Sequence, residues 1–310
     1  MIRRSLLAIT LITLALCIAI VTSLLAFTSH REPVSASQRQ APAITIPELT
    51  QHGPPPTTSA FTAYLVDADT SRVLADSNGE KPLPMASTTK IMTALIAIQT
   101  GNLDQLVTIK QDAYDEVHLY DGSSANLVVG DRLPLRDLIY GLMLPSGDDA
   151  AIAIADGLAQ TPANFVQRMN LFALRLHLFQ THYTNPDGLL SDNTTNPAHY
   201  TTAADLVRLT NYAMTLPLFR QVVQTQRYIV APTSQAHAYT WDNTNTLLQT
   251  YPGATGTKTG YTQEAGYCLV FSATHANHHL IGVLLNDVDS DHRFHDAVAL
   301  LNWGFGIPIS

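Results

Sequence analysis

Cysteine is nearly absent from the sequence, which limits how the folded part can be stabilised. Only Cys17 and Cys268 occur in 310 residues, and Cys17 lies within an apolar N-terminal run. No internal disulfide is therefore expected in the rest of the chain, and a hydrophobic core must stabilise it. The 46% hydrophobic content allows such a core. We interpret Cys268, in an apolar run, as a packing residue and not as a nucleophile.

Clusters of basic residues and glycine-rich phosphate loops are missing as well. The net charge is −8 at pH 7, and beyond the first four residues Lys and Arg are not clustered. Nucleic acids are bound by basic surfaces, so we expect no nucleic acid partner. Lysine itself is scarce, with four residues against 13 arginines. The positions that keep a lysine are therefore informative.

The N-terminal segment is typical of a membrane anchor. Arg3 and Arg4 precede 23 uncharged residues, 5–27, which can cross a bilayer core of roughly 30 Å. This run is longer than the apolar region of a cleaved signal peptide, and no small-x-small cleavage site follows it. We expect residues 1–4 to stay in the cytoplasm and 5–27 to anchor the chain, with a cleaved signal as the alternative. Residues 28–58, rich in Pro, Ser and Thr, predict a linker.

Residues 59–310 form the expected folded domain. Two strand-like runs joined at Asp67–Ser71 predict a hairpin at its start. Helical periodicity follows at Leu135–Leu144, Asp148–Gln160, Pro162–Leu178 and Ala203–Met214. Three further strands and a final helix are expected at Gly256–Thr262, Gly266–Thr274, His279–Asn286 and Asp291–Trp303. Both ends of the chain thus predict one sheet interrupted by a helical insert, with a ligand site at their junction.

The stretch Met85–Gly101, "MASTTKIMTALIAIQTG", holds one charge, Lys90, in a helical pattern that is apolar on every face. Such a helix is buried on all sides, so Lys90 is expected to be buried too. A buried ammonium is costly unless it finds partners or loses its proton. In a structural interpretation, Ser87 caps the helix and Lys90 extends its charge to solvent. In a catalytic interpretation the two side chains act together, and this stretch alone leaves both open.

A second lysine, Lys258, lies in the glycine-containing run "ATGTKTGYT". A lysine that protects an edge strand from aggregation is the structural alternative there. Together with Lys90, Lys258 completes three fragments in order, which are Ser87-Thr88-Thr89-Lys90, Ser146-Gly147-Asp148 and Lys258-Thr259-Gly260. These are the three motif types of serine-acylating β-lactamases and penicillin-binding proteins.

In these residues the chain resembles the low-molecular-mass penicillin-binding proteins that are serine D-Ala-D-Ala carboxypeptidases, related to class A β-lactamases. "NPDGL" at 185–189 and "HYTTAADLVRL" at 199–209 match that family in kind. The resemblance implies an α/β (α+β) fold of the β-lactamase/transpeptidase-like type, with a five-stranded antiparallel sheet flanked by helices and an inserted helical subdomain. It also implies a peptidoglycan stem peptide ending in D-Ala-D-Ala as substrate, acylation by β-lactam antibiotics, and neither a cofactor nor a metal.

Residue chemistry supports Ser87 as the nucleophile. Residues i and i+3 share a helix face, so Lys90 is expected beside the Ser87 hydroxyl as its base. Desolvation and the nearby cation Lys258 would favour a neutral amine at Lys90, a state that an arginine does not reach. With the anchor, this chemistry is expected on the extracytoplasmic side of a bacterial cell membrane, or in a secreted protein if the segment is cleaved.

The remaining roles come from the resemblance. The backbone N–H groups of Ser87 and Tyr261 would form the oxyanion hole, and Ser146 would relay a proton to the leaving amine. Lys258 and Thr259 would hold the terminal carboxylate of the substrate. Gly260 would leave room for a peptide along its strand.

Asp148 departs from the family pattern, which usually has Asn at this position. An ionised carboxylate cannot donate a hydrogen bond to a substrate carbonyl, and its charge would favour the protonated form of Lys90. An Asp between two lysines would also be partly neutralised, and a protonated Asp148 could still donate. We keep Asp148 among the expected substrate-binding residues.

Two alternative functions stay open. A class A-like β-lactamase needs a deacylating glutamate between the second and third motifs, and the chain has no Glu between Ser146 and Lys258. A non-catalytic penicillin-binding or peptide-binding protein is the other alternative. Only four residues precede the apolar run, which disfavours a sensor that signals inward.

Histidine is frequent, with 12 residues, and two groups raise the question of a metal site. The first group is His275, His278 and His279, and the second is Asp291, His292, His295 and Asp296. We interpret both as surface residues of a turn and of a helix start, and not as metal ligands.

Overall fold

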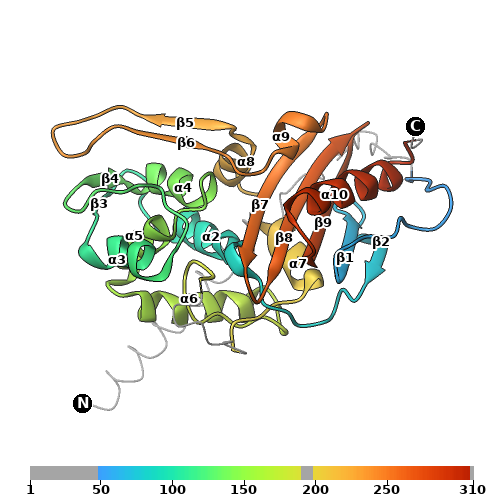
Figure 1. Ribbon diagram of the computed structural model, residues 1–310, viewed down its shortest axis with the longest axis horizontal. Helices are drawn as coiled ribbons and strands as arrows, with labels where there is room; N and C mark the ends of the chain where they lie inside the picture. Colours follow the sequence, from blue (N-terminus) through green and yellow to red (C-terminus); the bar gives the residue numbers. More distant parts are fainter. Residues whose placement is uncertain (1–47, 190–197, 308–310) are drawn as a thin grey trace, which may run out of the picture. The chain divides into compact units, whose positions relative to one another are not determined.

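Five antiparallel strands, taken from both ends of the chain, form the central sheet (Figure 1). Their order is β2-β1-β9-β8-β7. The strands are β1 (Thr62–Asp67), β2 (Arg72–Ser77), β7 (Ala254–Thr262), β8 (Gly266–His275) and β9 (His278–Asp287). The predicted N-terminal hairpin and the three later strands are confirmed. The boundaries of the later strands differ from the predicted ones by two residues or fewer.

The computed structural model describes residues 48–189 and 198–307, all within a unit of dense internal contacts that spans 46–310. The predicted cytoplasmic tail, the predicted anchor and most of the predicted linker lie outside these ranges. Within the described ranges, no helix combines the length and the apolar composition needed to cross a membrane.

The turn between β8 and β9 is a two-residue hairpin. Only Ala276 and Asn277 separate the strands, and their φ angles are 49° and 68°. Positive φ at both central residues is the turn conformation whose twist suits such a hairpin. His275 and His278 form the facing pair that closes the hairpin.

Helices cover both faces of the sheet, which explains why β8 and β9 are continuous apolar runs and not alternating ones. Helix α10 (Ser290–Gly304) packs on β8 and β9 from one side, and α7 (Ala203–Ala213) packs on β9 and β1 from the other (Figure 1). One buried cluster, which includes Phe271, Leu284 and Leu301, lies under α10. A larger cluster extends from the α7 face into the helical insert.

The helical insert is built around α2, which contacts α4, α5, α6 and α7. The helices are α2 (Lys90–Thr100), α4 (Leu135–Met143), α5 (Asp148–Ala159) and α6 (Pro162–Arg175). Every residue from Lys90 to Ala97 is buried, so the prediction of a helix buried on all sides is confirmed. Helix α6 ends three residues before the predicted end. His177 adopts a φ of 59° there, and the Leu178 N–H donates back to the Ala173 carbonyl, which stops the helix.

Several short elements were not expected from the sequence. They are α3 (Gln111–Tyr120), α8 (Pro217–Gln224), α9 (Leu247–Thr250), the pair β3 (Leu106–Thr108) and β4 (Arg132–Pro134), and the hairpin β5 (Arg227–Val230) and β6 (Tyr239–Asp242). Strands of three or four residues have too few positions to show alternation. The β5–β6 hairpin extends over the helical insert (Figure 1). The ring of Tyr228 stacks on that of Tyr140 in α4, with 3.7 Å between the ring centroids.

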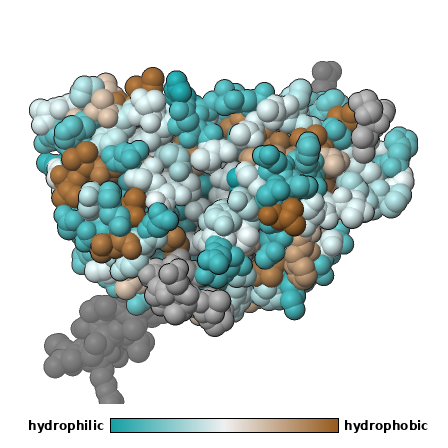
Figure 2. All heavy atoms as spheres, viewed as in Figure 1, coloured by the Kyte–Doolittle hydropathy of each residue, from teal (hydrophilic) through white to brown (hydrophobic). Residues whose placement is uncertain are grey.

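The face of the molecule seen in Figure 2 is mostly hydrophilic or neutral, and its apolar patches are small and separate. Exposed large apolar side chains in the described ranges include Leu171, Phe179 and Ile229. Scattered residues of this kind are normal for a soluble surface.

Candidate active site

Ser87 lies in a short 3-10 helix, η1 (Ala86–Thr89), immediately before α2. Its hydroxyl makes no capping bond, so the interpretation of Ser87 as a helix cap is wrong. Instead the Lys90 Nζ donates to the Ser87 Oγ at 2.8 Å. Side chains at i and i+3 eclipse in a 3-10 helix, and this aligns the serine with the lysine more directly than an α-helix would.

Lys90 is fully buried and fully partnered. Its side chain has 0% exposure, which rules out a charge extended to solvent. Besides Ser87, its Nζ donates to the Asp148 Oδ1 at 2.5 Å and to the backbone oxygen of Asp187 at 2.9 Å. An ammonium has three N–H donors, and all three are used. The cost of burying this charge is therefore offset by specific partners and not avoided by exposure.

Asp148, the departure from the family pattern, is the counter-ion of Lys90. It begins α5, is 2% exposed, and its second oxygen accepts from the Ser123 N–H at 2.7 Å. Burial raises the pKa of the Asp148 carboxyl, while Lys90 and the Ser123 N–H oppose that rise. Asp148 acts on both lysines, as its predicted position implies, but unequally. It forms a hydrogen-bonded ion pair with Lys90, whereas its charge only partly opposes the lowered pKa of Lys258.

The loop of residues 185–189, "NPDGL", packs against α2 beside Lys90. The Thr93 hydroxyl of α2 donates to the Pro186 oxygen at 2.5 Å. A Cβ atom at Gly188 would lie 1.9 Å from the Ala86 oxygen, so only glycine lets the loop approach η1, and its φ of 92° also favours glycine. This close approach brings the Asp187 backbone oxygen to Lys90.

Two further carboxyl groups near Lys90 were missed in the sequence. Asp187 is fully buried, and burial together with Asp148 holds its pKa well above the usual range. Glu116 on α3 is half-buried, and burial, followed by the charge of Asp148, raises its pKa to about 7. Three carboxyl groups thus surround one ammonium. No local pattern marks them, because α3 and the 185–189 loop reach Lys90 only through the tertiary fold.

Lys258 on β7 is also buried, at 1% exposure, although β7 is an edge strand. The interpretation of Lys258 as a solvent-facing edge lysine is therefore wrong. Its Nζ donates to the Thr259 backbone oxygen at 2.9 Å, and it forms no ion pair within the described residues. Burial, followed by the charges of Lys90 and Arg293, holds the pKa of Lys258 well below its ordinary value of 10.5. Thr259 is 6% exposed, and its hydroxyl shares a hydrogen bond of 2.7 Å with that of Thr244.

Gly260 brings β7 against η1. A Cβ atom at this position would lie 3.2 Å from the Ser87 nitrogen and 3.2 Å from the Ala86 Cβ. The absence of a side chain at Gly260 thus lets β7 approach η1, and the expectation that this glycine also leaves room for a peptide stays a prediction. The Tyr261 side chain is 55% exposed, and its ring lies against that of Tyr267. The Tyr261 backbone comes directly after Gly260, the residue that lies close to Ser87.

Arg293 on α10 also contacts β7, and no sequence motif marks it. Its Nη1 donates to the backbone oxygen of Gly260 at 3.0 Å and to that of Cys268 at 3.3 Å. The guanidinium lies 5.4 Å from the Tyr267 ring centroid. Cys268 itself is fully buried and burial raises its pKa to about 11, which agrees with its interpretation as a packing residue.

Ser146 lies in the connection between α4 and α5, two residues before Asp148. It adopts a φ of 66° and is 6% exposed. Its hydroxyl has no hydrogen-bond partner in the part of the chain that the structure describes, so it bonds to neither Ser87 nor Lys90 there. The fold therefore brings the three sequence motifs together: Lys90 bonds to both Ser87 and Asp148, and β7, which carries the third motif, lies beside them. The Ser146 hydroxyl bonds to none of these groups.

The histidine groups agree only partly with their interpretation as surface residues. His275 and His279 are exposed, as are Asp291, His292 and His295. His278 is only 6% exposed, whereas His279, the next residue of β9, is exposed. Asp296 is 9% exposed and accepts a hydrogen bond from the Ser59 N–H at 2.5 Å. The interpretation of His278 and Asp296 as surface residues is therefore wrong.

Comparison with known proteins supports this assignment of elements and motifs. A family model described as D-alanyl-D-alanine carboxypeptidase matches residues 49–289. The D-alanyl-D-alanine carboxypeptidase of Streptomyces sp. (strain K15) is 38% identical over 264 residues, which are 81% of this chain and 89% of that protein. The carboxypeptidase DacF of Bacillus subtilis (strain 168) is 30% identical over 79% of this chain, but only 62% of its own length is matched, so the chain spans less than two thirds of it.

Solved structures agree with the fold. The crystal structure of the Streptomyces K15 DD-transpeptidase matches with a TM-score of 0.76 and 38% identity, over 82% of this chain and 99% of that one. A D-alanyl-D-alanine carboxypeptidase from Mycobacterium tuberculosis H37Rv matches with a TM-score of 0.75 and 28% identity, over 84% and 96% of the two chains. These matches confirm the expected fold class. The chain belongs to the peptidase S11 family, the serine D-alanyl-D-alanine carboxypeptidases.

Proposed function

We propose that this D-alanyl-D-alanine carboxypeptidase uses Ser87 as its nucleophile and Lys90 as the general base. The single observation that carries the proposal is the 2.8 Å contact between the Lys90 Nζ and the Ser87 Oγ. A serine hydroxyl needs a base within hydrogen-bond reach to attack a carbonyl, and no other titratable side chain in the described residues bonds to it. The substrate is a peptidoglycan stem peptide that ends in D-Ala-D-Ala.

In the first step the Ser87 Oγ attacks the carbonyl carbon between the two D-Ala residues, and its proton passes to Lys90. This requires a neutral amine at Lys90. The ion pair with Asp148 and the pair of neutral amine and carboxylic acid differ only by the position of one proton along a contact of 2.5 Å. Burial disfavours both charges, and the raised pKa of Asp148 reflects the same preference.

Strand β7 and η1 supply the groups for the developing charge and for the substrate. We assign the backbone N–H groups of Ser87 and Tyr261 to the oxyanion, with a contribution of about 3 kcal/mol for one such donor in comparable sites. The Lys258 ammonium and the Thr259 hydroxyl bind the terminal carboxylate. Because Lys258 has no anionic partner in the described residues, an incoming carboxylate would stabilise its charged form.

Collapse of the tetrahedral intermediate breaks the peptide bond and leaves the acyl group on Ser87. The leaving D-Ala nitrogen takes a proton from Lys90 through the hydroxyl of Ser146. That hydroxyl has no partner in the described residues, so it is available for the transfer. Water then hydrolyses the ester. A β-lactam carbonyl would be attacked by the same Ser87 hydroxyl and would acylate the enzyme.

Transfer of the acyl group to an amine is a second candidate activity. The Streptomyces K15 relative carries the description DD-transpeptidase as well as that of carboxypeptidase. Hydrolysis and transfer share the acyl-serine intermediate and differ only in which nucleophile attacks it. A stem-peptide amine in the assay would therefore divert acyl groups from water if this activity is present.

We also propose that residues 5–27 anchor the protein and that residues 59–310 are the catalytic domain on the extracytoplasmic side. The support is the 23-residue uncharged run behind Arg3 and Arg4. Fractionation of cells that produce the full chain, with protease added from outside, tests this: the catalytic domain should be degraded only from the outer side.

The catalytic proposal is tested with the full chain in detergent. The protein is incubated with fluorescent penicillin and, separately, with a D-Ala-D-Ala-ended peptide whose released D-Ala is measured. Ser87→Ala should lose both reactions, while Ser234→Ala, which alters an exposed serine of the β5–β6 turn, should keep both. Labelling that survives in Ser87→Ala would remove Ser87 as the nucleophile.

A further inference from the structure

Two turns meet at one end of the sheet, away from Ser87. The β1–β2 turn contains Asp69, and the β8–β9 hairpin leads into His278. Strands β1 and β9 are antiparallel neighbours, with Asp67 facing Leu280. His278 lies two residues before Leu280, so the side chains of Asp67 and His278 share one face of the sheet as diagonal neighbours.

His278 is buried without a hydrogen-bond partner. The residue is 6% exposed, and its Nδ1 is inaccessible and unpartnered within the described residues. Buried imidazole nitrogens are normally hydrogen-bonded, so this one needs an explanation. One of its ring nitrogens lies within 4.8 Å of a carboxylate oxygen of Asp67 and of one of Asp69. The unpartnered ring thus faces two acids.

Asp67 is the second anomaly at this end of the sheet. It is 1% exposed, yet no Lys, Arg or His forms an ion pair with it in the described part of the chain. A buried carboxylate without a cation is costly. Its one hydrogen bond in these residues is from the Asp69 N–H to its Oδ1, at 3.0 Å. No hydrogen bond to its Oδ2 atom is found in the described residues.

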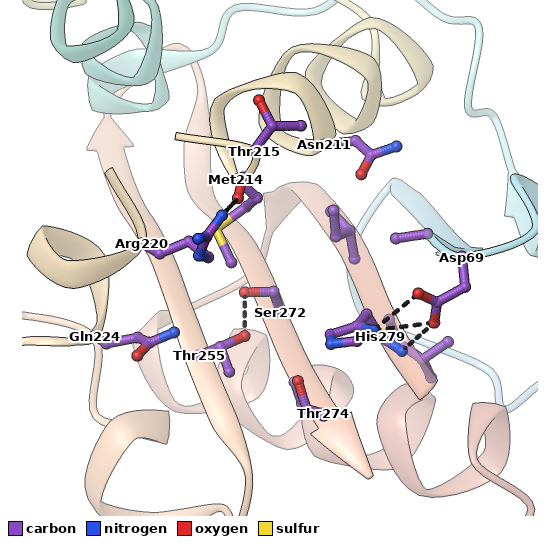
Figure 3. Close-up of a pocket in the computed structure, with 14 residues that line it drawn as sticks. Asp69, Asn211, Met214, Thr215, Arg220, Gln224, Thr255, Ser272, Thr274 and His279 are labelled. Atoms are coloured by element: carbon purple, nitrogen blue, oxygen red, sulfur yellow. Dashed lines mark hydrogen bonds and ion pairs between the residues drawn. The ribbon is translucent and has the colours of Figure 1, made fainter. Parts of the chain in front are cut away.

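Asp69 is held in place by the neighbouring residue of the hairpin. The His279 backbone N–H and Nδ1 donate to the Asp69 carboxylate at 2.8 and 2.9 Å, as Figure 3 shows for the paired side chains. The pair lies at the border of a cavity of about 320 Å³ between the sheet and helices α7 and α8. Carboxylates that bind metals are commonly oriented by such a hydrogen bond, which leaves lone pairs for the ion.

We propose that Asp67, Asp69 and His278 bind a divalent transition-metal ion such as Zn²⁺. Two carboxylate oxygens and one imidazole nitrogen are ligands that this class of ion accepts, and the exposed side of Asp69 leaves a fourth position to water. Ligand atoms of a tetrahedral zinc site lie about 3.3 Å apart when each bond is about 2.0–2.1 Å. The candidate ligand atoms lie within 4.8 Å of one another, so binding would draw them closer together.

The site would join the two turns and take no part in the serine chemistry. Asp67 is on β1, and two strands, β9 and β8, separate β1 from β7. At the usual strand spacing this is a distance of roughly 14 Å across the sheet. The bound ion would neutralise the buried carboxylate, give the imidazole its partner, and hold the β1–β2 turn against the β8–β9 hairpin.

The test is Zn²⁺ binding by the full chain after removal of metals with EDTA. Affinity and stoichiometry are measured by competition with a chromogenic zinc chelator. The wild type should bind one Zn²⁺, and Asp69→Asn and His278→Gln should bind it at least tenfold more weakly. The matched control is His295→Gln, which removes an exposed histidine of α10 and should bind as the wild type does.

Labelling with fluorescent penicillin reports whether each variant is folded. If His278→Gln fails to label, the exposed Asp69→Asn variant decides the question. A second readout is the shift of the melting temperature on addition of Zn²⁺, which should occur in the wild type and the control and be lost in Asp69→Asn. The proposal is overturned if the wild type binds no Zn²⁺, or if Asp69→Asn binds it as tightly as the control.

Discussion

The molecule contains two buried lysines that face opposite electrostatic surroundings. Lys90, in the helical insert, is in contact with the carboxylate of Asp148 and lies near two more carboxyl groups. Lys258, on the sheet, bonds to a backbone carbonyl and forms no ion pair in the described residues. Burial and the charges of Lys90 and Arg293 lower its pKa, and the charge of Asp148 opposes them only in part. Equal burial therefore has different consequences. The compensated lysine is suited to exchange a proton within the site, and the uncompensated one is suited to bind an anion that arrives with the substrate.

The largest effect is expected from removal of the compensated lysine. Lys90→Met leaves Asp148 buried without its cation, which costs roughly 3–5 kcal/mol of folding free energy in such pairs. Loss of the base should also lower penicillin acylation by roughly 10²- to 10⁴-fold. Urea unfolding at pH 8 and the labelling rate measure the two effects.

A double variant separates these effects. Lys90→Met combined with Asp148→Asn should recover most of the lost stability, because no charge is left without a partner, yet acylation should stay slow. Recovery of acylation in the double variant would contradict the role of Lys90 as base.

The same change at the uncompensated lysine should give the opposite pattern. Lys258→Met removes a buried cation that has no anionic partner in the described residues, so stability should be unchanged or higher. The KM for a D-Ala-D-Ala peptide should rise roughly ten- to hundredfold, the value of one charge-assisted hydrogen bond. Melting temperature and steady-state kinetics measure the two effects. A destabilised variant with an unchanged KM would contradict the proposed difference between the two lysines.

The lowered pKa of Lys258 predicts a pH dependence of binding. The side chain is charged only below its lowered pKa, so binding of a carboxylate should weaken as the pH rises through that value, below 10.5. In Lys258→Arg the charge persists throughout, because an arginine does not deprotonate in this range. The wild-type KM should therefore rise on the alkaline side while the KM of the variant stays level. Parallel profiles would show that Lys258 does not hold the carboxylate.

A smaller effect on the folding stability is expected from Glu116, one of the carboxyl groups near Lys90. Its pKa is about 7 in the folded protein against an ordinary 4.5. The folded state thus binds this proton more tightly than the unfolded state, so the carboxylate lowers stability as the pH rises from 4.5 through 7. Glu116→Gln should therefore be more stable relative to the wild type at pH 8 than at pH 4. A difference in unfolding free energy that is the same at both pH values would contradict the shift.

The sequence predicted the central sheet, most of the longer helices and the proximity of Ser87 to Lys90, because these rest on local patterns. They need only periodicity and neighbours within four residues. The supports of the site are long-range and leave no such trace. Arg293 reaches Gly260 across 33 positions, and the Asp187 oxygen reaches Lys90 across 97. The burial of His278 likewise depends on which face of a sheet a helix covers.

The smallest effect is expected from the residue that departs from the family pattern. Asp148→Asn removes the negative charge beside Lys90, and the buried lysine can respond by losing its proton, which favours the form that acts as base. An amide can also donate a hydrogen bond to a substrate carbonyl, as an ionised carboxylate cannot. The rate of penicillin acylation should therefore be kept or increased, with little loss of stability. Asp291→Asn, which changes an exposed aspartate in the first turn of α10, is the control for the loss of one negative charge at a helix start. A large loss of acylation in Asp148→Asn alone would mean that Lys90 becomes neutral only by passing its proton to this carboxylate, and the two lysines would then differ in mechanism as well as in charge.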